Sequence, residues 1–85
     1  MVPQKLINVV VRDRAGIQFE GEVKAITSHN PTGTFDILPM HTNFITVARQ
    51  KLILHQANGS KMELNIENGV LRASEDKVEI YLGVK

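Results

Sequence analysis

The chain has 85 residues, which leaves room for one small domain over residues 1–85 and for no second one. It contains no cysteine, which excludes a disulfide framework and a thiolate metal site. Ten Lys and Arg against nine Asp and Glu give a net charge of +1, which does not favour binding to nucleic acid. No apolar run approaches the roughly 20 residues that span a bilayer, so we expect a soluble, cytosolic chain without a signal peptide.

Short apolar and alternating runs in the first third of the chain are typical of β-strands. Gly21 interrupts these runs and predicts a bulge or a close backbone approach. The charged segment 12–16 ends in glycine and predicts a turn, whereas residues 29–33 contain Asn, Pro and Gly and predict a loop. The strands expected here are 6–11, 17–20 and 22–28.

The central stretch, residues 32–46, contains two apolar runs with a polar corner between them. Pro39 cannot donate a hydrogen bond to a β-ladder, so it ends the run that begins at Phe35. The second run, 44–47, is rich in β-branched and aromatic residues and suits a pleated surface. We therefore expect two short buried strands around an irregular corner that carries His41, and such corners often carry function.

Asn-Gly pairs divide the rest of the chain. Asn58-Gly59 predicts a two-residue hairpin, because both central positions of such a turn need positive φ. Asn68-Gly69 predicts a second hairpin on the same grounds. The expected strands are 51–56, 61–67, 70–74 and 78–82.

No segment has helical periodicity with caps, and breakers recur every eight to twelve residues, which predicts an all-β sandwich or barrel. We expect the alternating apolar residues to form its core. These are Leu6, Val9, Val11, Phe19, Val23, Ile26, Phe35, Ile37, Phe44, Ile45, Leu52, Leu54, Met62, Leu64, Ile66, Val70, Leu71, Val78, Ile80 and Leu82.

The chemistry-bearing residues do not form a recognisable catalytic or metal motif. No serine lies in a nucleophile elbow, and Asn30 to Thr34 has one glycine and no following helix, so it is no phosphate loop. Glu20 and Glu22 share a strand face and are expected to be solvated. No carboxylate stands at ligand spacing from the histidines. We therefore expect no catalytic residue, no metal and no cofactor.

The three histidines differ in their expected surroundings. His29 is expected in a solvated loop, and His55 is expected to face solvent beside Lys51. His41 either satisfies backbone groups of the corner or contacts a partner, and the two roles can coexist. Tyr81 alternates with core residues, so we expect it to face outward as an interface residue.

The central stretch also resembles a known family. Gly33-Thr34-Phe35-Asp36-Ile37-Leu38-Pro39-Met40-His41, followed by Phe44-Ile45-Thr46, is similar to the Gly-x-Phe-Gly-Ile-Leu-Pro-x-His-x-x-Leu-Ile-Thr segment of the ATP synthase epsilon subunit. Phe19-Glu20-Gly21-Glu22-Val23 resembles the family's Phe-x-Gly-x-Val, and residues 51–54 and 68–82 follow in collinear order. The resemblance covers nearly the whole chain.

This resemblance implies a flattened β-sandwich of about ten short strands. It implies a non-catalytic rotor subunit of the F-type ATP synthase, in the central stalk, that couples proton or sodium flow to ATP synthesis. Such a subunit joins the gamma subunit and meets the c-ring, while the catalytic sites lie on other subunits. It would be peripheral, at the cytoplasmic face of the cell (inner) membrane, and membrane-associated only through the synthase.

The family's contact residues map onto two segments. His41, Thr42 and Asn43 match the gamma-facing corner. Thr32, Gly33 and Thr34 match the loop that approaches the c-ring.

The chain departs from the family pattern at three points. Asp36 stands where the family usually has Gly, and its carboxylate either accepts a hydrogen bond from the local turn or contacts a partner. Asn43 stands where the family commonly has Pro. The sequence ends at Lys85, where the family continues into a helical hairpin, so we expect no such hairpin and assign neither inhibition nor ATP binding. Two alternatives stay open: a free-standing β-sandwich module that binds a small ligand or peptide, and a small enzyme.

Overall fold

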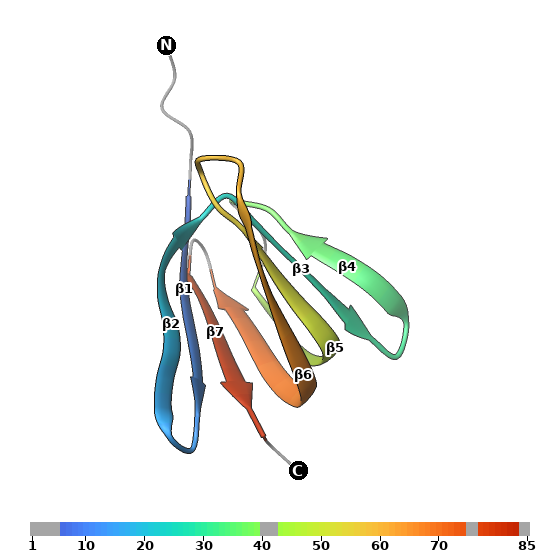
Figure 1. Cartoon of the computed structure of the whole chain (residues 1–85). Helices are drawn as coiled ribbons and strands as arrows, with labels where there is room; N and C mark the ends of the chain where they lie inside the picture. Colours follow the sequence, from blue (N-terminus) through green and yellow to red (C-terminus); the bar gives the residue numbers. More distant parts are fainter. Residues whose placement is uncertain (1–5, 40–42, 75–76, 84–85) are drawn as a thin grey trace.

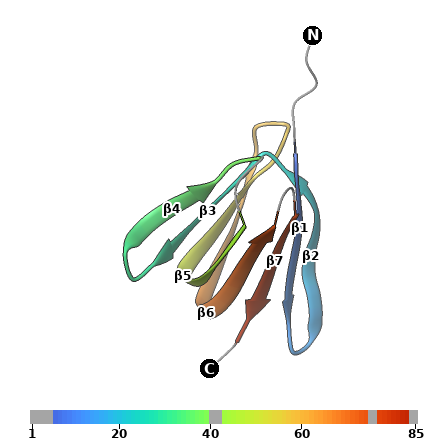
Figure 2. The ribbon, with the colours of Figure 1, turned by 180° about the vertical axis from the view of Figure 1, so that it is seen from behind.

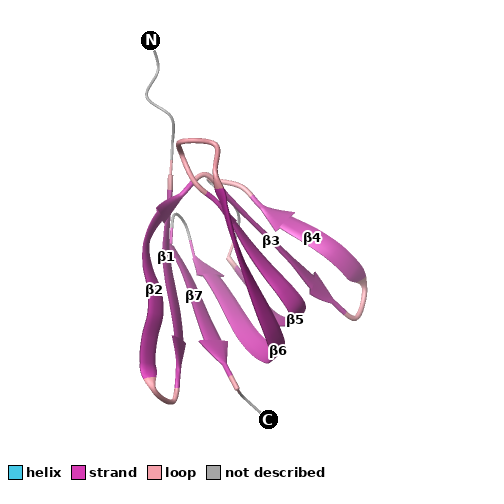
Figure 3. Cartoon of the chain, viewed as in Figure 1, coloured by secondary structure: helices cyan, strands magenta, loops and turns pink. Residues whose placement is uncertain are grey.

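The computed structural model describes residues 6–39, 43–74 and 77–83, and it is all-β, as predicted (Figure 1). The described residues contain no helix (Figure 3). The strands are β1 (Ile7–Asp13), β2 (Gly16–Val23), β3 (Ala25–Asn30), β4 (Gly33–Ile37), β5 (Phe44–His55), β6 (Lys61–Ser74) and β7 (Lys77–Leu82).

The strands form one sheet in the order β2-β1-β7-β6-β5-β3-β4, and the sheet folds over on itself into two layers (Figures 1 and 2). All neighbouring pairs are antiparallel except β1 and β7, which are parallel. The first layer holds β2, β1 and β7 with the second part of β6 and the first part of β5. The second layer holds β3 and β4 with the remaining parts of β5 and β6.

The long strands β5 and β6 pass from one layer to the other at a shared irregularity. The register shifts between Arg49, which pairs with Asn68, and Gln50, which pairs with Ile66, so Glu67 has no opposite residue. Gln50 has a φ of 70°, in the left-handed region that non-glycine residues rarely occupy. An extra residue on one strand bends an antiparallel ribbon and increases its twist, which accounts for the change of layer here.

The hairpin predicted at Asn68-Gly69 is wrong, because β6 continues through both residues. Gly69 pairs with Ala48 and with Leu82, in the middle of the sheet. A Cβ on Gly69 would lie 3.0 Å from the carbonyl oxygen of Tyr81 and 3.1 Å from a methyl carbon of Leu82. The glycine therefore permits a close approach of β7. Here β6 replaces the two expected strands 61–67 and 70–74, and β5 likewise replaces 44–47 and 51–56. The described residues therefore form seven strands where about ten were expected.

A hairpin at Asn58-Gly59 is confirmed, but the predicted two-residue turn is wrong, because Asn58 does not have a positive φ and the connection runs from His55 to Lys61. Gly59 has a φ of 92°, and the Gln56 amide donates to the Ser60 carbonyl at 2.8 Å. Asn58 Oδ1 accepts hydrogen bonds from the amide and the hydroxyl of Ser60, at 2.9 and 2.6 Å. This connection joins β5 to β6.

Neither the bulge nor the close backbone approach predicted at Gly21 lies there: the glycine is close to a side chain, and the bulge lies elsewhere. A Cβ on Gly21 would lie 3.3 Å from the ring end of Phe19. The strand runs unbroken through Gly21 to Val23. The register shift lies where Val11 pairs with Phe19 and Arg12 pairs with Ile17. The bulge expected at Gly21 is therefore displaced by a few residues towards the β1–β2 turn.

The core lies between the two layers, on their inward faces. Most of its predicted members are confirmed, while Ile7, Ala48 and Ala73 are buried residues that the prediction missed. Ser28 is the one buried polar residue among those described, and its hydroxyl donates to the Lys51 carbonyl at 2.8 Å. The buried apolar residues are Ile7, Val9, Val11, Val23, Ile26, Ile37, Ala48, Leu52, Leu54, Leu71, Ala73, Val78 and Ile80, with Phe19, Phe35, Phe44, Met62, Leu64, Ile66 and Leu82 packed against them.

Candidate docking surface

The predicted c-ring loop forms the tip of the β3–β4 hairpin. Thr32, Gly33 and Thr34 are all exposed. Asn30 Oδ1 accepts from the amides of Thr32 and Gly33 at 2.9 and 3.1 Å, which closes the turn from within. Gly33 has a φ of 133°, a conformation that L side chains rarely adopt. The tip therefore has a defined shape although it is exposed.

Thr34 closes the hairpin on its second side. Its hydroxyl lies 3.0 Å from Nδ1 of His29, the residue that it faces across the strand pair. His29 thus belongs to β3 and is half-buried, so its expected place in a solvated loop is wrong. The side-chain amide nitrogen of Asn30, Nδ2, donates to the Thr46 hydroxyl of β5 at 3.1 Å. This hydrogen bond connects the hairpin to the first layer.

The predicted gamma-facing corner is described only in part. His41 and Thr42 lie outside the described residues. Asn43 is exposed and directly precedes β5. The residues that follow it run along the edge of the first layer, so the surface next to the corner can be described.

Ile45 is exposed by 69%, so its predicted place in the core is wrong. Successive side chains of a strand point to opposite faces. Because Phe44 packs against the core, Ile45 must point outward, and Val47, exposed by 37%, follows it on the outer face. This alternation was readable in the sequence and should have excluded one of the two residues from the core.

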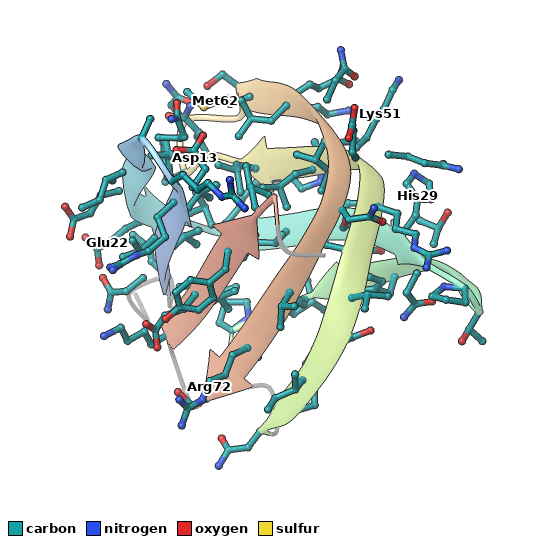
Figure 4. All side chains as sticks on the ribbon, turned by 90° about the horizontal axis from the view of Figure 1, so that it is seen from below. Asp13, Glu22, His29, Lys51, Met62 and Arg72 are labelled. Atoms are coloured by element: carbon teal, nitrogen blue, oxygen red, sulfur yellow. The ribbon has the colours of Figure 1, made fainter. Side chains whose placement is uncertain are left out.

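The outer face of the first layer continues this apolar edge across the sheet. We define the outer face by the outward residues of four neighbouring strands: Ile45 and Val47 of β5, Val70 and Arg72 of β6, Glu79 and Tyr81 of β7, and Val10 and Arg12 of β1. They form two rows by register, Ile45-Arg72-Glu79-Val10 and Val47-Val70-Tyr81-Arg12. Figure 4 shows Arg72 extending away from the ribbon.

Tyr81 is at the centre of a polar and aromatic cluster on this outer face. Its hydroxyl donates to Glu79 Oε2 at 2.8 Å, and the guanidinium carbon of Arg12 lies 5.7 Å from the centre of its ring. Such a distance is typical of a cation–π contact. Val10 stands opposite Glu79 and is only 9% exposed although it points outward. Tyr81 therefore points outward, as predicted, and its ring is held by its neighbours.

The cluster changes the acidity of its two titratable groups. The hydrogen bond from Tyr81 lowers the pKa of the Glu79 carboxyl below 4.5, against the opposing effect of burial and with further lowering by Lys77 and Arg72. The same hydrogen bond, together with burial and the negative charge of Glu79, raises the pKa of Tyr81 above 10.0. Both shifts favour a charged Glu79 and a neutral Tyr81.

A second group of polar side chains lies on the outer side of the second layer. The Thr27 hydroxyl of β3 donates to Asp36 Oδ1 of β4 at 2.5 Å and lies 2.9 Å from Nε2 of His55 in β5. Asp36 therefore bonds across the strand pair and not within a local turn. His55 is half-buried and bonded, whereas it was expected to face solvent.

This group lines an open cleft of about 640 Å³, together with Lys24, Ala25, Leu38 and Pro39. The order of its bonds does not suit nucleophilic catalysis. A nucleophilic hydroxyl gives its proton to a histidine base, whereas the Thr27 proton is directed at Asp36.

Among the described residues, no three His, Asp or Glu side chains gather as metal ligands. Within the same residues, no helix has the length and apolar character to cross a membrane.

Comparison with known proteins agrees with the sequence resemblance. Residues 6–82 match the family described as the ATP synthase delta/epsilon chain, beta-sandwich domain. The ATP synthase epsilon chain of Sulfurovum sp. (strain NBC37-1) is 29% identical over 63 residues, which cover 73% of this chain. The chain spans about half, 49%, of the length of that relative.

Two solved structures share the fold. A chain of the Euglena gracilis mitochondrial ATP synthase, from a structure of its OSCP, F1 and c-ring, aligns with a TM-score of 0.85 at 19% identity and covers 96% of this chain and 52% of its own length. A chain of the Tetrahymena thermophila mitochondrial ATP synthase, from its central stalk and c-ring, aligns with a TM-score of 0.74 at 11% identity. This alignment covers 95% of the present chain and 66% of the Tetrahymena chain. Because the family match spans nearly every residue, the chain belongs to the beta-sandwich domain family of the ATP synthase delta/epsilon chain.

Proposed function

We propose that this chain is a non-catalytic central-stalk subunit of an F-type ATP synthase, which docks on the gamma subunit and the c-ring and helps to couple ion flow to ATP synthesis. Its family membership and its likeness to an epsilon chain support this role. In this proposal the catalytic sites lie on other subunits. The chain is peripheral to the membrane, on the cytoplasmic face of the cell (inner) membrane, and is held there only by the synthase.

The exposed apolar edge formed by Ile45 and Val47 is the observation that carries this proposal. It borders the Tyr81–Arg12 cluster on the outer face. Protein interfaces combine an apolar and aromatic centre, often with arginine, and a polar rim. Removing these side chains from water stabilises a complex by roughly 25 cal/mol per Å² of apolar surface. The gamma subunit is the proposed partner of this face, with His41, Thr42 and Asn43 as further contacts at its edge.

The hairpin tip at Thr32, Gly33 and Thr34 is the proposed contact for the c-ring. Its turn is closed internally by Asn30, so the tip keeps its shape while its own backbone and hydroxyl groups remain exposed. Exposed hydroxyls and amides can meet the polar loops of a partner directly or through bridging water. A preformed turn also limits the entropy lost on binding.

Reconstitution would test both contacts separately. We expect Ile45→Asp to abolish co-elution with the gamma subunit, because a charge would be buried in the interface. We expect Gly33→Val to leave gamma binding unchanged and to reduce recovery of the gamma complex on c-rings, because valine rarely adopts the φ of this position. Wild-type chain that fails to co-elute with gamma would refute the proposal.

The cleft on the second layer favours a second candidate function, a free-standing module that binds a small ligand or a peptide. Its volume of about 640 Å³ lies in the range of ligand pockets. A thermal-shift screen of the isolated chain would support this function if a ligand raised the melting temperature and Leu38→Asp removed the effect. Gamma binding without any such ligand would favour the first proposal.

A further inference from the structure

Thr27, Asp36 and His55 have a fixed order of proton donation. The Thr27 hydroxyl has one proton, and it is donated to Asp36. The 2.9 Å contact with His55 therefore requires the ring nitrogen Nε2 to carry a hydrogen and to donate it to the Thr27 oxygen. The direction is His55 to Thr27 to Asp36. A carboxylate at the end of such a chain polarises and strengthens both bonds.

The hydrogen-bonded chain of His55, Thr27 and Asp36, which we call the relay, joins β5, β3 and β4. It lies at the edge of the sheet, where β4 is the last strand. In the described sheet β4 pairs only with β3, over the five positions from Gly33 to Ile37. Asp36 is the second-last residue of β4, directly before the segment that leads through Pro39 to Asn43 and β5. Through the relay, β4 is also bonded by side chains to β3 and, through Thr27, to His55 of β5.

Two other side chains of this hairpin also bond to β5: the side-chain amide of Asn30 donates to the Thr46 hydroxyl, and the Ser28 hydroxyl donates to the Lys51 carbonyl. Both start from β3, whereas the relay starts from Asp36 of β4. Thr34 and His29 form a bond of the same kind, but it links only β3 and β4 and lies at the opposite end of β4. Within the described residues, Asp36 lies next to the last residue of β4, where the chain leaves for the connection to β5, whereas Thr34 lies near the start of β4. Leu38, at the start of that connection, is 60% exposed and contributes little packing of its own.

We propose that Asp36 is a positioning residue: through Thr27 it holds His55 as the Nε2–H tautomer, and the resulting relay fixes the end of β4 with Leu38 and Pro39, on the side from which the chain continues to the gamma-docking face. The effect on docking rests on the proposed function, whereas the tautomer does not. Asp36→Asn keeps an oxygen that can accept the Thr27 hydrogen bond, whereas Asp36→Ala and Thr27→Val remove the relay. Thr34→Val is the matched control, because it removes the other Thr–His contact of the same strand pair.

Nitrogen-15 NMR of the isolated chain tests the tautomer, at a pH about two units above the ordinary histidine pKa of ~6.5. We expect wild-type His55 in the Nε2–H form and a mixture of both tautomers in Thr27→Val and Asp36→Ala. Thr34→Val should change His29 and leave His55 as in the wild type. A wild-type His55 in the Nδ1–H form, or an unchanged His55 in Thr27→Val, overturns the relay.

Titration with the gamma subunit tests the positioning role. We expect Asp36→Ala to weaken gamma binding about tenfold, while Asp36→Asn and Thr34→Val stay within about twofold of the wild type. Asp36→Ala that binds gamma as tightly as wild type, even with a lowered melting temperature, overturns positioning. If wild type itself binds no gamma, the docking role fails, and the tautomer measurement still decides the relay.

Discussion

The Tyr81 hydroxyl donates a 2.8 Å hydrogen bond to Glu79, the residue two positions back on the same face of β7. On the same outer face, the guanidinium carbon of Arg12 from β1 lies 5.7 Å from the centre of the tyrosine ring. An aromatic ring, an arginine and a carboxylate are thereby held in place before any partner arrives. Preorganised side chains lose less entropy on binding, which suits a docking role.

Glu79→Gln should reduce the loss of stability in acid. The folded-state pKa of Glu79 is lowered, so its contribution to stability is fully present above the unfolded value of 4.5 and is lost as the pH falls through the folded value. Glutamine still accepts the Tyr81 hydrogen bond but does not titrate. Between about pH 6 and pH 3 we expect the wild-type melting temperature to fall about 1–3 °C further than that of Glu79→Gln, a small effect because solvent screens this half-buried surface group.

Glu63→Gln provides the control for this titration. Glu63 is an exposed carboxylate on β6, in the layer that does not carry the Tyr81 cluster. Thermal melts of the three proteins across the same pH range would check the expectation. If the melting temperature falls equally in wild type and Glu79→Gln as the pH is lowered, the hydrogen bond between Tyr81 and Glu79 does not determine stability in acid.

Gln50→Gly should stabilise the chain. A side chain in the left-handed region costs about 1–2 kcal/mol, and glycine avoids that cost while losing about 0.5–1 kcal/mol in backbone entropy. We expect a net gain of up to about 1 kcal/mol, or a few degrees in melting temperature. Lys51→Gly, at the next residue of β5, should instead lower it. Calorimetry in which both variants are destabilised alike would show that Gln50 is not strained.

Gly69→Ala should destabilise the sheet more than Gly21→Ala. At Gly69 the new methyl meets the rigid backbone of Tyr81, whereas at Gly21 it meets the end of the Phe19 ring, which can move. We expect a cost of about 1–3 kcal/mol at Gly69 and less than about 1 kcal/mol at Gly21. Urea unfolding of both variants would measure the difference. The reverse ranking would show that β7 does not approach β6 as closely as described.

The two Asn-Gly pairs show how far local rules carry the fold. Asn58-Gly59 and Asn68-Gly69 have the same residues, and each is flanked by strand-forming runs. The first forms a hairpin, although not the predicted two-residue turn, while the second lies inside β6, because the surrounding residues pair with both β5 and β7. Tertiary pairing overrides turn propensity there. Fold class and most core positions followed from alternation, whereas the number of strands depended on the long-range pairing that makes β5 and β6 each continuous where two strands were expected.

The residues of the candidate surfaces could be predicted from the sequence only where they did not depend on long-range strand pairing. The outward position of Ile45 was available from the alternation with Phe44, and the motif itself pointed to the hairpin tip at Gly33. The relay was not available, because Thr27 and His55 are 28 residues apart and meet only through the pairing of β3 with β5. The pattern singled out Asp36 as a departure from the family, but the sequence did not indicate its partner.

Ile45→Asp should weaken partner binding by at least tenfold and change the melting temperature by no more than about 3 °C, because the side chain is 69% exposed in the free chain. Ile17→Asp is the matched control. Ile17 is 55% exposed on β2, at the opposite edge of the first layer from β5. Similar losses of affinity in both variants would show that binding depends on surface charge and not on the apolar edge.

Isothermal titration of the wild-type chain with the gamma subunit tests the central claim most directly. We predict saturable one-to-one binding with a micromolar or lower Kd and a negative heat-capacity change, as burial of Ile45 and Val47 requires. The same titration with Ile45→Asp should show no saturation at tens of micromolar. A wild-type chain that is folded by its melting curve and yet gives no heat with gamma at that concentration at any of three temperatures would contradict the account.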